Sequence, residues 1–308
     1  MSRLYETLKR LEEGRPGSIL PAIDAGAPQP PAHPEARSID PAPTAPRHLS
    51  PAPVSVEAPG APSSEYRRTI RMRLDARAPL FPFDGTDVRA AEQYRMLRTN
   101  LLQHEKQPRV IAVTSGDASD GKTITSINIA AALALNASGN VLLIDADMRR
   151  GTIAPLLGVP ASPGLAQVLH RTATLDEAVV RLEQAPNLHV LPGGGSSRNP
   201  AELLDSPAWK SLLRTAREQF RFTIVDTTPV AAVADFDLVQ SAVDGVLLVV
   251  RPEHTRRSIL DEAFSVVPKA RLLGVVVNCV KDWLLWKHYG SSYYYGAPRP
   301  DAAPGVRS

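Results

Sequence analysis

The chain has 308 residues, of which 43% are hydrophobic, so it can hold one large α/β domain together with additional segments. Its formal net charge is only +3, which gives no reason to expect a nucleic-acid partner. One cysteine excludes an internal disulfide framework, and the absence of a signal peptide or an apolar run of ~18 residues favours a cytoplasmic protein without a membrane span.

Residues 1–15 are predicted to form a short amphipathic helix, because Leu4, Leu8 and Leu11 recur at helical spacing. A helix of this length is unstable alone in water, so it either docks against a partner or the rest of the chain, or frays as a free terminus. Residues 16–65 are rich in proline and alanine and are predicted to be a disordered, extended linker.

Residues 66–83 are predicted to be a basic connector. Within it Ile70, Met72 and Leu74 alternate with polar and basic residues, which is typical of a solvated edge strand. Its arginines then face solvent or, as an alternative, anionic lipid headgroups. The folded domain is predicted to follow at residues 84–280.

The domain is expected to begin with a long helix that is capped by Asp84 or Thr86. Glu92, Arg95 and Arg98 recur in it at three-residue spacing and therefore share one face. From spacing alone this pattern favours a row of ion pairs on the helix surface.

Residues 116–123 have the sequence GDASDGKT and match the phosphate-binding P-loop pattern G-x-x-x-x-G-K-[ST]. An apolar strand at 110–113 precedes the loop and a helix at 124–135 follows it, which is the context that this motif requires. Glycines let backbone N–H groups approach phosphate oxygens, and the helix N-terminus adds partial positive charge. The residues expected to contact the nucleotide here are Gly116, Ala118, Ser119, Asp120, Gly121, Lys122, Thr123 and Ile124.

Acidic residues follow two other apolar strands. Asp145 and Asp147 come after one of them, and Asp226 follows another in the Walker-B arrangement. Ligands of open α/β sheets bind at the carboxyl ends of the strands, so we expect these side chains to lie near the P-loop.

Each polar group then has an expected role. Lys122 reaches the β- and γ-phosphates of ATP, and Thr123 binds Mg²⁺, whose waters Asp147 and Asp226 hold. Asp145 orients or deprotonates an incoming hydroxyl group. Asn278, after the last predicted strand, reads the nucleotide base or is a simple polar turn residue.

Apolar strands are predicted at 110–113, 141–144, 188–191, 222–225, 245–250 and 272–277. Helices are predicted between them, among them 207–220, with an inner stripe of Trp209, Leu212, Leu213 and Ala216, and 255–267. This alternation predicts an α/β fold with a mainly parallel sheet and helices on both faces.

Residues 281–308 form a tail rich in Trp and Tyr. It holds four of the seven tyrosines, at Tyr289, Tyr293, Tyr294 and Tyr295, among Gly, Ser and Pro residues. We expect a flexible segment whose tyrosines accept phosphate, each modification adding about −1.5 to −2 charges. A sticky or stacking aromatic patch is the alternative.

Residues 86–296 resemble the bacterial tyrosine autokinases of polysaccharide export, the BY-kinases. The resemblance rests on the E-x-x-R-x-x-R spacing, the P-loop, LIDADMR at 143–149, NPAELL at 199–204, the strands that end in Asp226 and begin at Gly245, and the tyrosine tail. It implies a P-loop NTPase fold of the SIMIBI/MinD type and ATP-dependent tyrosine phosphorylation between subunits.

The resemblance also implies partners. The subunits form a homo-oligomeric ring with Glu92, Arg95 and Arg98 at its interface, which replaces the interpretation from spacing. A separate membrane-embedded chain-length or activator protein brings the kinase to the inner face of the cell membrane. In such families the kinase regulates polymerisation and export of exopolysaccharide or capsule.

Two departures from the family pattern bear on activity. Ser119 stands where the family usually has glycine, so a positive φ there is strained, and Thr228 replaces a proline. Two other functions share this pattern. A partitioning-type ParA/MinD ATPase has a signature lysine where this chain has Asp117, and a non-catalytic scaffold of the export machinery binds nucleotide without transferring phosphate.

Overall fold

The computed structural model describes residues 68–75, 79–81, 87–136, 139–195, 197, 199–230 and 235–280. Their strands are β1 (Arg68–Ile70), β2 (Val110–Ser115), β3 (Val141–Asp145), β4 (Val180–Leu182), β5 (Ala185–Leu191), β6 (Phe222–Asp226), β7 (Gly245–Val250) and β8 (Leu272–Val277). Their helices are α3 (Val88–Leu102), α4 (Lys122–Asn136), α5 (Ile153–Leu157), α6 (Leu165–Leu169), α7 (Leu175–Ala178), α8 (Pro200–Asp205), α9 (Pro207–Gln219), α10 (Asp235–Ala242) and α11 (Arg257–Val266). The predicted N-terminal helix, linker and tyrosine tail lie outside the described residues.

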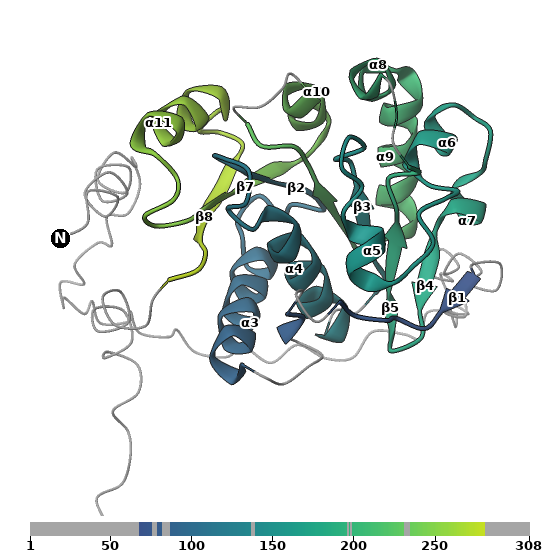
Figure 1. Cartoon of the computed structure of the whole chain (residues 1–308), viewed down its shortest axis with the longest axis horizontal. Coiled ribbons are helices and arrows are strands. Elements are labelled where there is room, and N and C mark those ends of the chain that lie inside the picture. Colours follow the sequence, from purple (N-terminus) through teal and green to yellow (C-terminus); the bar gives the residue numbers. More distant parts are fainter. Residues whose placement is uncertain are drawn as a thin grey trace, which may run out of the picture. The chain divides into compact units, whose positions relative to one another are not determined.

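The strands form an eight-stranded sheet in the order β1-β4-β5-β3-β6-β2-β7-β8, with helices on both faces (Figure 1). Every neighbouring pair is parallel except β4 and β5, so the predicted mainly parallel α/β fold is confirmed. β7 and β8 have the predicted bounds, and β2, β3 and β6 each extend one or two residues beyond theirs.

The prediction missed the reversal at β4. The strand expected at 188–191 is the second half of β5, and β4 precedes it as an antiparallel neighbour. β4 has only three residues, too few to show a period in the sequence. The edge strand predicted within 66–83 is present as β1, which pairs with β4 at the end of the sheet.

Helix packing follows the apolar stripes. In α9 the predicted stripe Trp209, Leu212, Leu213 and Ala216 is buried, which confirms that prediction. α4 packs on the central strands and against α3 (Figure 1). The cap of α3 is corrected: Asp87, not Asp84 or Thr86, accepts a hydrogen bond from the Ala90 N–H at 2.9 Å.

Three adjacent central strands position the site. β3, β6 and β2 lie side by side, with Asp145 opposite Asp226 and Asp226 opposite Val113 in register. These strands are fully buried on both faces, as expected when helices cover a parallel sheet. Their carboxyl ends therefore meet at one edge, beside the loop that follows β2. Among the described residues, no helix is both long and apolar enough to cross a membrane.

Candidate active site

The P-loop connects β2 directly to α4, as predicted. Ser115 ends the strand, Lys122 begins the helix, and Gly121 between them has φ +95°. At this φ any residue with a side chain is strained, and a Cβ on Gly121 would also lie 2.0 Å from Asn278 Nδ2, so the Asn278 side chain would have to move. Ser119 has φ +69°, which is the positive φ that is strained for a residue with a side chain.

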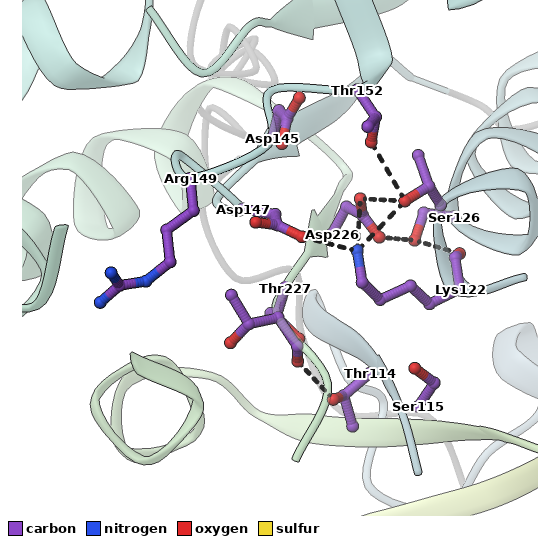
Figure 2. A network of polar contacts seen from close by, with 12 residues as sticks. Thr114, Ser115, Lys122, Ser126, Asp145, Asp147, Arg149, Thr152, Asp226 and Thr227 are labelled. Carbon is purple, nitrogen blue, oxygen red and sulfur yellow. Dashed lines mark hydrogen bonds and ion pairs between the residues drawn. The ribbon is translucent and has the colours of Figure 1, made fainter. Parts of the chain in front are cut away.

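The Lys122 ammonium lies between two buried carboxylates (Figure 2). Its Nζ is 3.0 Å from Asp147 Oδ2 and 3.5 Å from Asp226 Oδ2. The Thr123 hydroxyl donates to Asp226 Oδ2 at 2.8 Å and is 3.2 Å from the same ammonium. Strand ends far apart in the sequence thus meet the P-loop, as the acidic residues after β3 and β6 predicted.

Burial and charge act against each other in this cluster. Burial disfavours the charged form of Lys122, but Asp226 and Asp147 outweigh it, so the pKa of Lys122 is raised. Burial likewise raises the pKa of Asp226, although Lys122 and the Thr123 and Ser126 hydroxyls oppose the shift. The Lys122 ammonium therefore opposes the protonation of Asp226 that burial favours.

Asp145 lies beside this cluster and is fully buried. Its Oδ2 accepts a hydrogen bond from the Ile153 N–H at 3.0 Å, whereas its Oδ1 has no hydrogen-bond partner among the described residues. The pKa of Asp145 is raised to about 7, mainly by burial and to a smaller extent by the charge of Asp226. A carboxyl group with this pKa is suited to accept a proton near neutral pH.

The oxygen atoms around the Lys122 ammonium fit a Mg²⁺ ion. Asp147, Asp226 and Thr123 surround one positive charge with carboxylate and hydroxyl oxygens, which are the donors that Mg²⁺ prefers. Among the described residues, no group of three or more His, Cys, Asp or Glu side chains is arranged to hold a metal by itself. Mg²⁺ commonly uses only one or two carboxylates together with substrate phosphates, so the set fits such a site.

Two residues predicted to contact the nucleotide have protein partners. The Asn278 amide donates to the Asp120 carbonyl oxygen at 2.9 Å, and its own oxygen accepts from the Cys279 N–H. The Asp120 side chain is fully buried and bonds to His254 and Thr255. Both residues therefore brace the loop from the side of β7 and β8.

The three residues of the expected ring interface lie on α3. Glu92 and Arg95 form an exposed ion pair at 2.7 Å, as the spacing predicted. Arg98 NH1 is 3.5 Å from the Ala132 carbonyl oxygen of α4. They are separate from the cluster around Lys122.

Sequence reasoning missed several polar partners of the site. Ser126, one turn after Lys122 on α4, donates to Asp226 Oδ1 at 2.9 Å, and Thr152 lies 3.4 Å from the Thr123 hydroxyl. Arg149 makes a two-pronged ion pair with Asp235 at 2.8 and 3.1 Å, which ties the turn after β3 to α10. The position of Ser126, four residues after Lys122, could have predicted that it lies near the site. No local pattern predicts the contact between Arg149 and Asp235, which are 86 residues apart.

The predicted phosphoacceptors Tyr289, Tyr293, Tyr294 and Tyr295 lie outside the described residues. Within them Tyr94 is the single tyrosine, and it is 9% exposed and stacked on Phe81 at a centroid distance of 5.9 Å. Burial raises the pKa of Tyr94 to about 12. Tyr94 is thus poorly suited to accept a phosphoryl group.

Comparisons with known proteins give consistent similarities. A family model described as an AAA domain matches residues 108–263, which include the P-loop and the three acidic residues. Tyrosine-protein kinase YwqD of Bacillus subtilis (strain 168) is 34% identical over 208 residues, covering 66% of this chain and 86% of YwqD. The crystal structure of the chimerical protein CapA2B2 has a TM-score of 0.61 at 27% identity and covers 68% of this chain and 92% of its own. The kinase domain of Escherichia coli tyrosine kinase ETK has a TM-score of 0.60 at 27% identity, covering 74% and 98% of the two chains.

Proposed function

Because this chain belongs to the bacterial tyrosine kinases of the P-loop type, we propose that it transfers the γ-phosphoryl group of ATP to tyrosines. We further propose that the acceptors are the C-terminal tyrosines of a neighbouring subunit. The observation that carries this function is the convergence of Lys122, Thr123, Asp147 and Asp226 at the start of α4, with Asp145 beside them. A P-loop, a cationic side chain and acidic strand ends are the shared parts of phosphoryl-transfer sites.

Each group of residues in this site would have a separate role in phosphoryl transfer. Backbone N–H groups of the P-loop bind the phosphates, and Lys122 offsets negative charge on the group being transferred. Thr123, Asp147 and Asp226 would hold Mg²⁺, which supplies neutralisation of phosphate charge when it is bound. Catalysis then depends on position and charge more than on covalent chemistry.

Asp145 would act as the general base that accepts the proton of the tyrosine hydroxyl. The tyrosine hydroxyl gives its proton to Asp145 as its oxygen bonds to the γ-phosphorus, and the bond to the bridging oxygen of ADP breaks. Gly193 borders this carboxyl group, since a Cβ at Gly193 would lie 3.8 Å from Asp145 Cγ. Asp145 is fully buried, so part of the chain that borders it must move before an incoming tyrosine can reach it.

The choice of acceptor is supported by elimination within the described residues. Tyr94 is buried and its pKa is raised to about 12, so phosphorylation there would require local opening. The remaining candidates include the cluster Tyr289, Tyr293, Tyr294 and Tyr295.

We propose a ring-forming assembly through the outer face of α3. Beside the Glu92–Arg95 ion pair, the apolar side chains of Val88 and Met96 are 73% and 53% exposed, so this part of α3 offers both charged and apolar groups. Such a mixed face suits a contact with a second copy. Attachment to the membrane through an embedded activator, and control of exopolysaccharide or capsule export, are the wider role that we propose.

Phosphotyrosine mass spectrometry of the full chain with Mg²⁺ and ATP tests the function. We expect phosphate on the 289–295 peptide of the parent, its loss in Lys122→Met, and no loss in Tyr94→Phe. Mixing folded Lys122→Met with a variant that carries Phe at all four tail positions should phosphorylate the Lys122→Met tail, because transfer occurs between subunits. ATP hydrolysis without phosphotyrosine would instead indicate a partition-type ATPase, and binding without turnover would indicate a scaffold.

A further inference from the structure

The side chain of Asp120 holds the P-loop from the side opposite the carboxylate cluster. Asp120 occupies a variable position of the P-loop pattern, yet it is fully buried. Its Oδ2 accepts a hydrogen bond from the Asp117 N–H at 2.8 Å. Its Oδ1 accepts from the Thr255 hydroxyl at 2.8 Å and lies 2.9 Å from His254 Nδ1.

These partners come from the next two strands of the sheet. His254 and Thr255 belong to the connection between β7 and α11, and Asn278 at the end of β8 donates to the Asp120 carbonyl oxygen at 2.9 Å. Since β2, β7 and β8 are consecutive neighbours, their carboxyl ends lie together. One residue of the loop is thus bound to two separate segments of the chain.

The loop needs such support because its backbone is strained. Ser119 and Gly121, on either side of Asp120, have φ of +69° and +95°. A left-handed conformation is costly for serine, and surrounding contacts must maintain it. Hydrogen bonds to a charged carboxylate are among the stronger ones available for this purpose.

We propose that Asp120, together with His254 and Thr255, is a clamp that positions the P-loop for phosphate binding and thereby sets the affinity for ATP. The inference rests on the proposed nucleotide function. Among the described residues, the Asp120 carboxylate forms no hydrogen bond or ion pair with Lys122, Asp147 or Asp226. Its removal therefore changes the shape of the loop and leaves these reacting groups in place. Asp120 is therefore a positioning residue, and its loss acts on ATP binding more than on turnover.

Calorimetric titration of the full chain with Mg²⁺ and ATP, together with steady-state kinetics, tests the clamp. Asp120→Ala should weaken ATP binding about tenfold or more, the effect of losing hydrogen bonds to a charged group. His254→Ala and Thr255→Val should weaken it several-fold, with KM for ATP raised and kcat nearly unchanged. His170→Ala, at an exposed histidine at the end of α6, is the matched control and should bind as the parent does.

Comparing ATP affinity in the single and double variants distinguishes the clamp from a general loss of folding. Adding Thr255→Val to Asp120→Ala should weaken ATP binding less than Thr255→Val does in the parent, because the Thr255–Asp120 bond is already absent and only the bond from the Arg251 N–H to Thr255 is lost in addition. Should Asp120→Ala fail to fold, His254→Ala still decides the matter, since the His254 side chain is 39% exposed. Parent-like ATP affinity in both His254→Ala and Thr255→Val would overturn the clamp. A parent chain that binds no ATP would overturn the proposed function itself.

Discussion

Replacing Lys122 by methionine should do more than abolish phosphate transfer. Methionine keeps the length of the side chain and removes its charge, which in the nucleotide-free chain lies 3.0 Å from Asp147 and 3.5 Å from Asp226. Because Lys122 is only 7% exposed and both carboxylates are buried, water cannot replace the ammonium without rearrangement. The variant would therefore hold several buried carboxylates without a compensating charge.

The expected loss of stability follows from this geometry. Removing one partner of a buried ion pair costs about 3–5 kcal/mol, because the remaining charge is left uncompensated. The raised pKa values of Asp226 and Asp145 show that these groups can take up protons instead, which limits the damage. We expect about 3 kcal/mol of lost unfolding free energy at neutral pH, the lower end of that range.

Urea unfolding in the presence of a chelator measures this effect, with Lys210→Met, at an exposed lysine of α9, as the matched control. Adding Asp147→Asn to Lys122→Met should restore part of the stability but none of the kinase activity. Millimolar Mg²⁺ without nucleotide should stabilise Lys122→Met more than the parent, since the ion and the ammonium would use the same oxygen atoms.

Unfolding of Lys122→Met at the same urea concentration as the parent and the Lys210→Met control would refute the neutralising role of Lys122. An equal response of parent and variant to Mg²⁺ would show that the ammonium does not lie where the ion binds. Either result would remove Lys122 from its assigned place between Asp147 and Asp226.

Three further predictions concern other parts of the chain. Hydrogen bonds from Arg217 and two backbone N–H groups outweigh burial and lower the pKa of Asp244, so Asp244→Asn should cost about 1–3 kcal/mol at pH 7. In urea unfolding this difference should begin to shrink below about pH 4, the ordinary pKa of an unfolded Asp, and should vanish only below the lowered pKa of the folded carboxylate. Ser119→Gly should raise the unfolding free energy by roughly 0.5–1 kcal/mol, because glycine adopts the φ of +69° without strain, and a lower urea midpoint would contradict this. Met96→Glu on the exposed face of α3 should shift the full chain toward monomers in analytical ultracentrifugation, whereas unchanged sedimentation would count against that face as the ring contact.

Local patterns were enough to identify most of the fold. The strands at 245–250 and 272–277 were found with their observed bounds because each is a run without polar residues, although only β7 is fully buried and β8 is half-buried at the end of the sheet. β4 was not predicted because three residues are too few to show an alternation of apolar and polar side chains. Its direction depends on pairing with β5 rather than on its own composition.

The P-loop and its acidic partners were predictable for a similar reason. The P-loop pattern is set by the local backbone conformation that phosphate binding needs, and Asp145, Asp147 and Asp226 follow apolar strands that a parallel sheet must align. Ser126 and Asp235 were missed because their importance depends on partners about 100 and 86 residues away.

The sequence by itself therefore determined the fold class, the phosphate loop and the acidic residues near it. Only the tertiary structure decided that Lys122 neutralises Asp147 and Asp226, that Asp145 has a pKa of about 7, and that Asp120 faces His254. The physical reason is that hydrophobic periodicity and turn geometry are properties of neighbouring residues. Charge, burial and hydrogen bonding in the site depend instead on segments that only the assembled sheet brings together.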